Sequence, residues 1–297
     1  MPAEIRINNV IRQYFDLRRA IRTKHVAIPS LLRCAKSDEK IECSDTVEAE
    51  DFSLVRQLPA IPSKDMVPIK LDSSQHISKD IIETVEAEIL DCLTLLVDKL
   101  PDELLKKVLI LFLAIEIKDL ETAKHCARVC LTSAKVGELC GLNKEEQMEL
   151  IIGAILHDIG KLFFPDSLFS NSDALSTREL EITRKHPEQG LVIIKDQELD
   201  YMPGVAHSIR SHHENINGRG YPDSLKGGLI PLPGRIVKLT DSYDAMTHGR
   251  SYQLSIALDE AIDRIHRSRS IAFDPDLVQL FESLVQQKPV KLQEVKT

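Results

Sequence analysis

Tryptophan is absent from the 297 residues, and aromatic residues together make up only 4% of the chain. The core must therefore consist of aliphatic side chains, which favours helices over a β-sandwich. Basic residues are fewer than acidic ones, and the formal net charge of -8 argues against a broad nucleic-acid-binding surface. We therefore expect no nucleic-acid polymer as a partner, although a local group of cations can still bind a small phosphate ester.

Paired cysteines and long apolar runs are missing as well. The absence of any C-x-x-C pair excludes a zinc ribbon and a thioredoxin-like motif, and the scattered thiols suit a reducing compartment. The most apolar run, residues 108–115, is too short to span a bilayer. The first residues, MPAEIRINNVIRQ, lack the apolar core of a signal peptide. We expect a cytoplasmic protein that makes no contact with a membrane.

The chain divides into an irregular first part and a helical remainder. After a short helical pattern within residues 1–33, an acidic stretch and three prolines predict irregular structure, with short strands at 52–55 and 67–71. From residue 78 onward, N-cap residues, early acids and apolar residues at helical spacing predict successive helices, with starts near 121, 144 and 176. No βαβ alternation occurs. We expect an all-α domain at 104–290, preceded by a connecting helix at 78–103 and a small region at 1–77.

The role and fold of the N-terminal region stay open in the sequence. Residues 1–77 resemble no known family, and their position indicates a regulatory or dimerisation role with an α+β fold as one option. The helix predicted from residue 78 to residue 98 carries an apolar stripe that includes Ile81, Val85, Ile89, Cys92 and Leu96. This stripe either packs on its own domain or forms the seam of a homodimer.

Histidines and carboxylates recur in the helical part in contexts typical of metal ligands. In ILHDIGK, residues 155–161, His157 and Asp158 offer a neutral nitrogen and a carboxylate that can bridge two cations. Glu121 and His125 in ETAKH are four positions apart and share one face of a helix. Imidazole and carboxylate ligands together suit Fe, Mn or similar divalent metals. The other candidates are His186 in KHPEQG, His212 and His213 in SHHENINGRGYP, and Asp241 in LTDSYDAM.

This ordered set of motifs resembles the HD-GYP family, a subgroup of the HD superfamily of metal-dependent phosphohydrolases. The resemblance covers residues from about 104 to 285 and rests on ETxxH, HDxGK, HP, HHExxNGxGYP and an Asp followed by YDAMTxxR. It implies a helical domain that hydrolyses c-di-GMP to pGpG or GMP by attack of a metal-bridging hydroxide. It also implies a GGDEF-domain protein as a partner at the GYP loop.

The resemblance assigns roles to individual residues. Asp158 bridges two metals, and Glu121 stands where some members bind a third; from the residues alone, Glu121 could instead orient His125. Lys161 resembles a lysine that contacts the scissile phosphate and assists catalysis. Two or three divalent ions, iron or manganese, are implied as cofactors. The implied metal ligands are Glu121, His125, His157, Asp158, His186, His212, His213 and Asp241.

The substrate contacts are less strictly defined. Arg250 resembles a second phosphate contact, although it could also pair with an acid such as Asp244, and Tyr221 of the GYP segment is expected to contact the substrate. Gln253 stands where the family often has a basic residue, which leaves another cyclic dinucleotide (cGAMP) or a mononucleotide as alternative substrates. A non-catalytic c-di-GMP-binding signalling module is a further alternative.

Residues outside the motifs receive an ordinary structural interpretation. A lone histidine is more often a core or surface residue than a ligand, and Cys126 and Cys130 beside His125 are expected to be small buried apolar residues. The histidines interpreted in this way are His25, His76, His207, His248 and His266.

Overall fold

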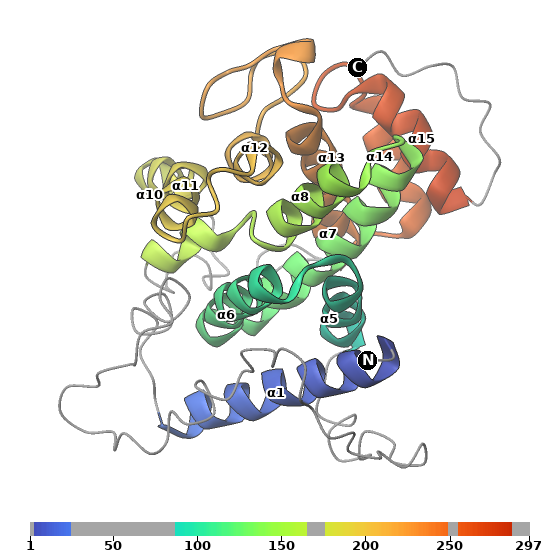
Figure 1. The fold of residues 1–297 in the computed structure, drawn as a ribbon. Coiled ribbons are helices and arrows are strands. Elements are labelled where there is room, and N and C mark those ends of the chain that lie inside the picture. The colour runs from blue at the N-terminus through green and yellow to red at the C-terminus, as the bar shows by residue number, and fades with distance from the viewer. Residues whose placement is uncertain (1–2, 25–86, 165–175, 249–254, 287–297) are drawn as a thin grey trace. The chain divides into compact units, whose positions relative to one another are not determined.

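The computed structural model describes residues 3–24, 87–164, 176–248 and 255–286. Every regular element in these ranges is a helix (Figure 1), accompanied by isolated β-bridges. The predicted all-α fold class is therefore confirmed. The strands expected at 52–55 and 67–71 lie outside the described residues. The chain divides into two compact units, which we call unit 1 (Met1–Ile117) and unit 2 (Lys118–Thr297). The limits expected at residues 77, 103 and 290 stay a prediction.

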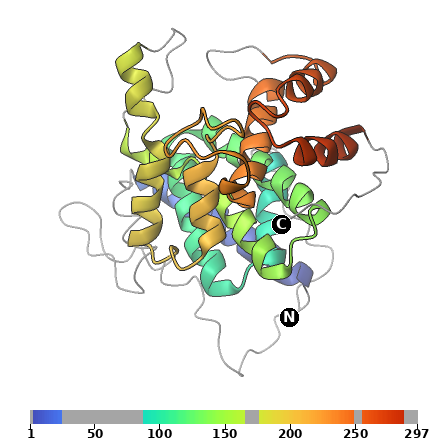
Figure 2. The ribbon, with the colours of Figure 1, turned by 90° about the horizontal axis from the view of Figure 1, so that it is seen from above.

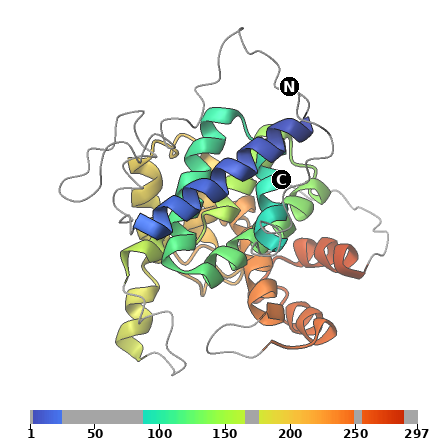
Figure 3. The same cartoon turned by 90° about the horizontal axis from the view of Figure 1, so that it is seen from below.

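A buried charged contact fixes the first helix of unit 1. The unit contains α1 (Ala3–Lys24), α5 (Ala87–Lys99) and α6 (Asp102–Lys118), apart from the last residue of α6. Figure 3 shows α1 running across the two later helices. The fully buried Glu116 carboxylate of α6 accepts a 2.6 Å hydrogen bond from the Tyr14 hydroxyl and pairs with Arg18. This contact holds α1 on α6, because a buried carboxylate is costly unless donors satisfy it.

The apolar run at residues 108–115 lies in α6, where its side chains are shielded from solvent. In α5, the stripe residues Ile89, Cys92 and Leu96 are completely buried. This burial favours packing inside the chain over a dimer seam for the described part of the stripe. No helix in the described ranges has both the length and the apolar character that a membrane span requires.

Unit 2 is built around four helices that contact one another in a closed cycle. In cycle order they are α7 (Leu120–Leu139), α8 (Lys144–Ile155), α12 (Pro203–Ser211) and α13 (Leu232–His248). Beside α12 lies α11 (His186–Asp196), as Figure 2 shows, and α11 packs on the 3₁₀ helix η2 (Ile159–Phe163). The last helices, α14 (Leu258–Arg267) and α15 (Pro275–Gln286), pack against α13. Shorter elements are α10 (Thr177–Thr183) and η3 (Gly227–Leu229).

Capping side chains explain where the helices of unit 2 begin. Asp119 accepts hydrogen bonds from the first turn of α7, and Asn143 forms a capping box with Glu146 at the start of α8. A second capping box joins Ser176 and Glu179 at α10. The helix starts predicted near residues 121, 144 and 176 agree with these starts to within one residue.

A close approach of η2 and α11 depends on glycine. A Cβ atom added to Gly160 would lie 1.9 Å from the His186 carbonyl oxygen and 2.6 Å from the Gly190 backbone nitrogen. Both neighbouring atoms belong to the backbone of α11, so no side-chain movement can relieve the overlap. Gly160 of the HDIGK motif therefore allows Asp158 and His186 to approach each other.

We expect Gly160→Ala to destabilise the protein by about 3 kcal/mol or more, which is the upper end of the usual cost of overpacking. The cost is high because the backbone of α11 must move. Urea unfolding of the metal-free protein measures the change. Gly228→Ala is the matched control, since an added Cβ there meets no atom within 4 Å, and it should change stability by less than about 0.5 kcal/mol. Equal stability of the two variants would contradict the packing argument.

Candidate metal centre

The structure brings most of the predicted ligands together inside unit 2, from five different places in the chain. His125 lies in α7, His157 and Asp158 follow α8, and His186 begins α11. His212 and His213 follow α12, and Asp241 lies in α13. These side chains are buried, except for the half-buried His213. Two clusters result, in each of which the ligand atoms lie within 4.8 Å of one another: His125 with His157 and Asp158, and His186 with His212 and His213.

Asp158 connects the two clusters. Its Oδ2 atom lies 3.4 Å from His157 Nε2 and 4.0 Å from His125 Nε2, whereas its Oδ1 atom lies 3.4 Å from His186 Nε2. The two oxygens of one carboxylate therefore face different clusters. This arrangement fits a carboxylate that bridges two cations.

Backbone carbonyls orient three of the histidines in the same way. His157, His186 and His212 each direct Nδ1 at the carbonyl oxygen three residues earlier, at 2.7–2.8 Å. A carbonyl oxygen can only accept, so Nδ1 carries the proton and Nε2 of the neutral ring carries a lone pair. The position of each histidine at a helix end thereby selects the tautomer that can bind a metal through Nε2.

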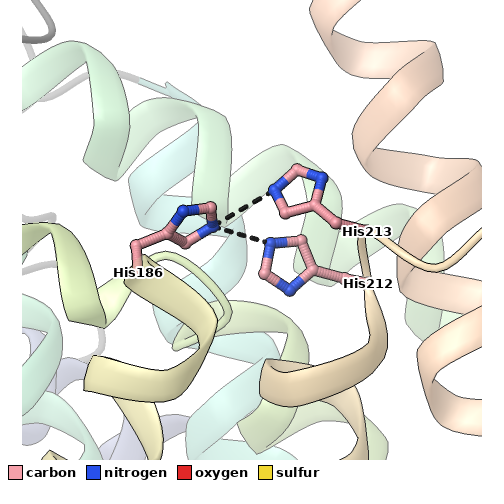
Figure 4. Close-up of side chains that lie close together, drawn as sticks. All are labelled: His186, His212 and His213. Carbon is pink, nitrogen blue, oxygen red and sulfur yellow. Dashed lines mark hydrogen bonds between the residues drawn. The ribbon is translucent and has the colours of Figure 1, made fainter. Parts of the chain in front are cut away.

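The lone pairs converge on one another. Figure 4 shows His186 facing His212 and His213, with its Nε2 atom 3.1 Å from the Nε2 atom of each. Burial lowers the pKa of His186 to about 4, and burial also holds the pKa of His212 and His213 well below the usual value. Near neutral pH the rings are therefore neutral, and His186 and His212, which carry their proton on Nδ1, direct Nε2 lone pairs at each other.

A bound cation would accept the electron pairs of these nitrogen and oxygen atoms. The Nε2 atom of His157 is buried and makes no hydrogen bond, which is costly for a polar atom. Facing imidazole lone pairs together with nearby carboxylates form the donor set that divalent transition metals prefer. The residues present therefore fit the metal ions that the motif resemblance implies.

The remaining ligand candidates of the first cluster are held by a salt-bridge network. His125 Nδ1 donates to Asp244 Oδ2 at 2.7 Å, and its Nε2 lies 3.1 Å from Asp241 Oδ1. Asp244 also accepts two hydrogen bonds from the Arg128 guanidinium, at 2.7 and 2.9 Å. Burial raises the pKa of Asp244, but the hydrogen bonds from His125 and Arg128 outweigh it and lower that pKa overall. Asp244 thus stays ionised and orients His125.

Sequence reasoning missed this role of Asp244. It named Asp244 only as a possible partner for Arg250. Arg250 and Gln253 lie outside the described residues. A signal was present in the spacing: Asp241 and Asp244 are three positions apart on one helix, as are His125 and Arg128, so each pair shares a helix face.

Lys161 lies next to the bridging carboxylate. Its Nζ atom is 2.5 Å from Asp158 Oδ2. Burial raises the pKa of Asp158, but the neighbouring groups, Lys161 first among them, outweigh it and hold that pKa well below the usual value. The carboxylate therefore stays ionised, with the Lys161 ammonium beside the Oδ2 atom that faces the first cluster.

Of the described ligand candidates, neither cluster includes Asp241, which lies 3.1 Å from His125 Nε2, or Glu121. The Glu121 side chain is 76% exposed and pairs with Lys124 at 2.9 Å. Helical spacing places Glu121 and His125 on one face of α7, but Glu121 belongs to the first turn, where the side chain meets solvent.

The GYP segment folds back over the second cluster. The Tyr221 ring stacks on His213 with ring centroids 4.7 Å apart, and the Arg184 guanidinium lies 5.4 Å from the centroid of Tyr221. The buried Glu214 carboxylate accepts hydrogen bonds from the backbone of Asp223 and Leu225, at 2.7 and 3.1 Å. Sequence reasoning quoted Glu214 within the motif but gave it no role; it holds this loop against the metal centre.

Residues outside the motifs behave mainly as side chains of the core and the surface. Cys126 and Cys130 are buried, as expected. His266 pairs with Glu282 at 2.7 Å, whereas His248 contacts Asp244 at 3.0 Å. His25 and His76 lie outside the described residues.

Known proteins share these features over part of their length. The cyclic di-GMP phosphodiesterase response regulator RpfG of Xanthomonas campestris is 33% identical over 165 residues, which are 56% of this chain and 44% of that protein. A cyclic di-GMP phosphodiesterase of Thermotoga maritima is 33% identical over 183 residues, 62% of this chain and 50% of its own length. The 3'3'-cGAMP-specific phosphodiesterase 2 of Vibrio cholerae is 32% identical over 167 residues, 56% of this chain and 32% of that protein. The chain thus matches half or less of the length of these relatives.

A solved structure has a similar fold. Bd1817, an HDG"Y"P protein from Bdellovibrio bacteriovorus, superimposes with a TM-score of 0.50 and 17% identity, covering 68% of this chain and 74% of that protein. At this identity the likeness shows the fold alone. The profile of the HD domain family matches residues 111–277, more than half of the chain, and together with the relatives it confirms the resemblance predicted from the motifs. The chain belongs to the HD domain family.

Proposed function

We propose that this chain is a metal-dependent phosphodiesterase that hydrolyses c-di-GMP to pGpG, GMP or both. The observation that carries the proposal is the position of Asp158, whose two oxygens face different histidine clusters. Relatives that are named cyclic di-GMP phosphodiesterases support the choice of substrate.

In this proposal each cluster holds one divalent ion, iron or manganese. His125, His157 and Asp241 serve the first ion, His186, His212 and His213 serve the second, and Asp158 is shared. Bound there, such ions would acidify water and offset negative charge on a phosphodiester.

Side chains of the protein orient the proposed ligands and stabilise negative charge on the substrate. Asp244 fixes the Nδ1 proton of His125, so that Nε2 faces Asp241. The ammonium of Lys161, beside Asp158, is placed to stabilise charge that develops on a non-bridging phosphate oxygen. Tyr221, stacked on His213, offers an aromatic edge at the rim for substrate contact, and Arg250 is proposed as a second phosphate contact.

Three further parts of the proposal rest mainly on the sequence. A GGDEF-domain partner at the GYP loop follows from the motif resemblance, and a homodimer would have to use surface other than the buried stripe residues Ile89, Cys92 and Leu96. A cytoplasmic location rests on the free thiols, which suit a reducing compartment and include Cys92, Cys126, Cys130 and Cys140.

A second substrate, 3'3'-cGAMP, is favoured by a specific observation: the chain is 32% identical over 167 residues to a phosphodiesterase named for it. Turnover of c-di-GMP, 3'3'-cGAMP and mononucleotides, followed side by side by chromatography with Mn(II) or Fe(II), separates these substrates. Binding of c-di-GMP by the fully metal-loaded protein without any turnover would contradict an enzyme and support a signalling module.

We expect His157→Ala to abolish turnover and to lower the metal content. The substitution removes a buried Nε2 atom that makes no hydrogen bond and whose lone pair is proposed to bind the metal. Elemental analysis and the chromatographic assay measure the two effects. The matched control His266→Ala removes a histidine paired with Glu282 outside the centre and should retain both. Full metal content and normal turnover in His157→Ala would refute this ligand assignment.

Asp244→Asn should reduce metal affinity or turnover by roughly 10- to 100-fold, the usual effect of losing a carboxylate that orients a metal-binding histidine. Competition with a chelator measures the affinity. Asp200→Asn, which changes an exposed carboxylate of unit 2, is the control and should match the original protein. An unchanged affinity in Asp244→Asn would exclude the orienting role.

Metal content also tests Glu121, which the resemblance proposes as ligand of a third ion. Because the side chain is exposed and paired with Lys124, we expect two ions per chain both in the original protein and in Glu121→Gln. A decrease from three ions to two on this substitution would instead assign Glu121 as a ligand.

A further inference from the structure

A cleft in unit 2 lies between α13 and α14. Its volume is about 810 Å³, within the range of roughly 300–1,000 Å³ that small-molecule sites occupy. The α13 wall includes Lys238, Ser242 and Met246, which recur every four positions and therefore share a helix face. Asp241 and Asp244 of the same helix contact His125. The cleft adjoins the metal centre through α13, but its lining includes none of the proposed metal ligands.

Three of the four charged residues that line the cleft are basic. Lys238 enters from α13, Arg264 and Arg267 from α14, and Glu260 is the acidic residue among the lining side chains. Arg264 pairs with Glu260 at 2.6 Å and Arg267 with Asp263 at 2.7 Å, each along the exposed side of α14. Exposed pairs of this kind contribute little to stability, so both guanidinium groups can turn toward an anion at low cost.

Lys238 differs from the two arginines because its ammonium has no ion pair along its own helix. Burial lowers the pKa of its ammonium, although the Asp241 and Glu214 carboxylates act in the opposite direction. Within the described part of the chain no hydrogen bond or ion pair of this side chain is found. The half-buried Lys238 ammonium thus lines the cleft without a close anionic partner, and an anion in the cleft would provide that partner.

The remaining lining has a different character. Ala245, Met246, Ala272 and Phe273 supply apolar surface, and Ser242 and Ser268 add hydroxyl groups. Arginine and lysine together recognise phosphate through bidentate and point-charge contacts. Apolar and aromatic surface beside them suits a flat ring. The combination fits a molecule with a phosphate group and an aromatic base.

We propose that the cleft between α13 and α14 binds a nucleoside monophosphate, with its phosphate at Lys238, Arg264 and Arg267 and its base against the Phe273 side. None of the residues of this site is a proposed metal ligand, and its existence does not depend on the proposed phosphodiesterase activity.

Isothermal titration calorimetry of the full chain with 5′-GMP and with inorganic phosphate tests the proposal. Each titration is done on chelator-treated protein and on Mn(II)-loaded protein, since binding that requires the metal belongs to the metal centre. We expect 5′-GMP to bind the metal-free protein and to bind Lys238→Met about tenfold more weakly, as for the loss of one charged hydrogen bond. Arg264→Gln, a change on the exposed side of α14, should weaken binding similarly.

Arg269→Gln is the matched control, because it removes an exposed arginine of the same region that does not line the cleft, and it should bind 5′-GMP as the original protein does. No binding to the metal-free protein, or equal binding by Lys238→Met and the original protein, would overturn the proposal. Inorganic phosphate binding as tightly as 5′-GMP would overturn a nucleotide site. Turnover of cyclic dinucleotides is assayed separately, so failure of one proposal is distinguishable from failure of the other.

Discussion

The buried carboxylate of Asp158 lies between two groups of imidazoles, and much of unit 2 serves to compensate its charge. The Lys161 ammonium holds the pKa of Asp158 low, while His186 approaches from the opposite side at 3.4 Å. An ionised carboxylate in a low-dielectric interior is tolerated only where charges or cations surround it. The same need that keeps this carboxylate paired also makes the centre attractive to divalent ions.

The helices deliver these groups because the histidines and acids stand at helix ends or on inward faces of the four-helix cycle. α8 ends just before His157, α11 begins at His186, and α12 ends just before His212. Gly160 lets η2 and α11 approach closely enough for Asp158 to reach His186. In unit 1, by contrast, a carboxylate is satisfied by protein donors alone, since Tyr14 and Arg18 both contact Glu116.

Local sequence was sufficient to predict the helices of unit 2 and the identity of the clustered ligands. Capping residues and ordered motifs act within a few positions, so they can be recognised without the fold. The contact between His125 and Asp244 joins residues 119 positions apart, and only the packing of α7 on α13 creates it. Glu121 shows the opposite limit: helical spacing correctly relates it to His125, but spacing cannot tell that the first turn of α7 is exposed. The cleft at Lys238 is likewise a product of how α14 packs against α13.

The histidines of the centre differ in what orients them, and this difference has an evolutionary consequence. His157, His186 and His212 are oriented by backbone carbonyls, which every amino acid provides, so this orientation does not depend on which side chain stands three positions earlier. His125 is oriented by the Asp244 side chain, which is itself held by Arg128. Among related chains, the orientation of the histidines should therefore restrict positions 125, 128 and 244, which change together or not at all, whereas at positions 154 and 209 core packing sets the side chain.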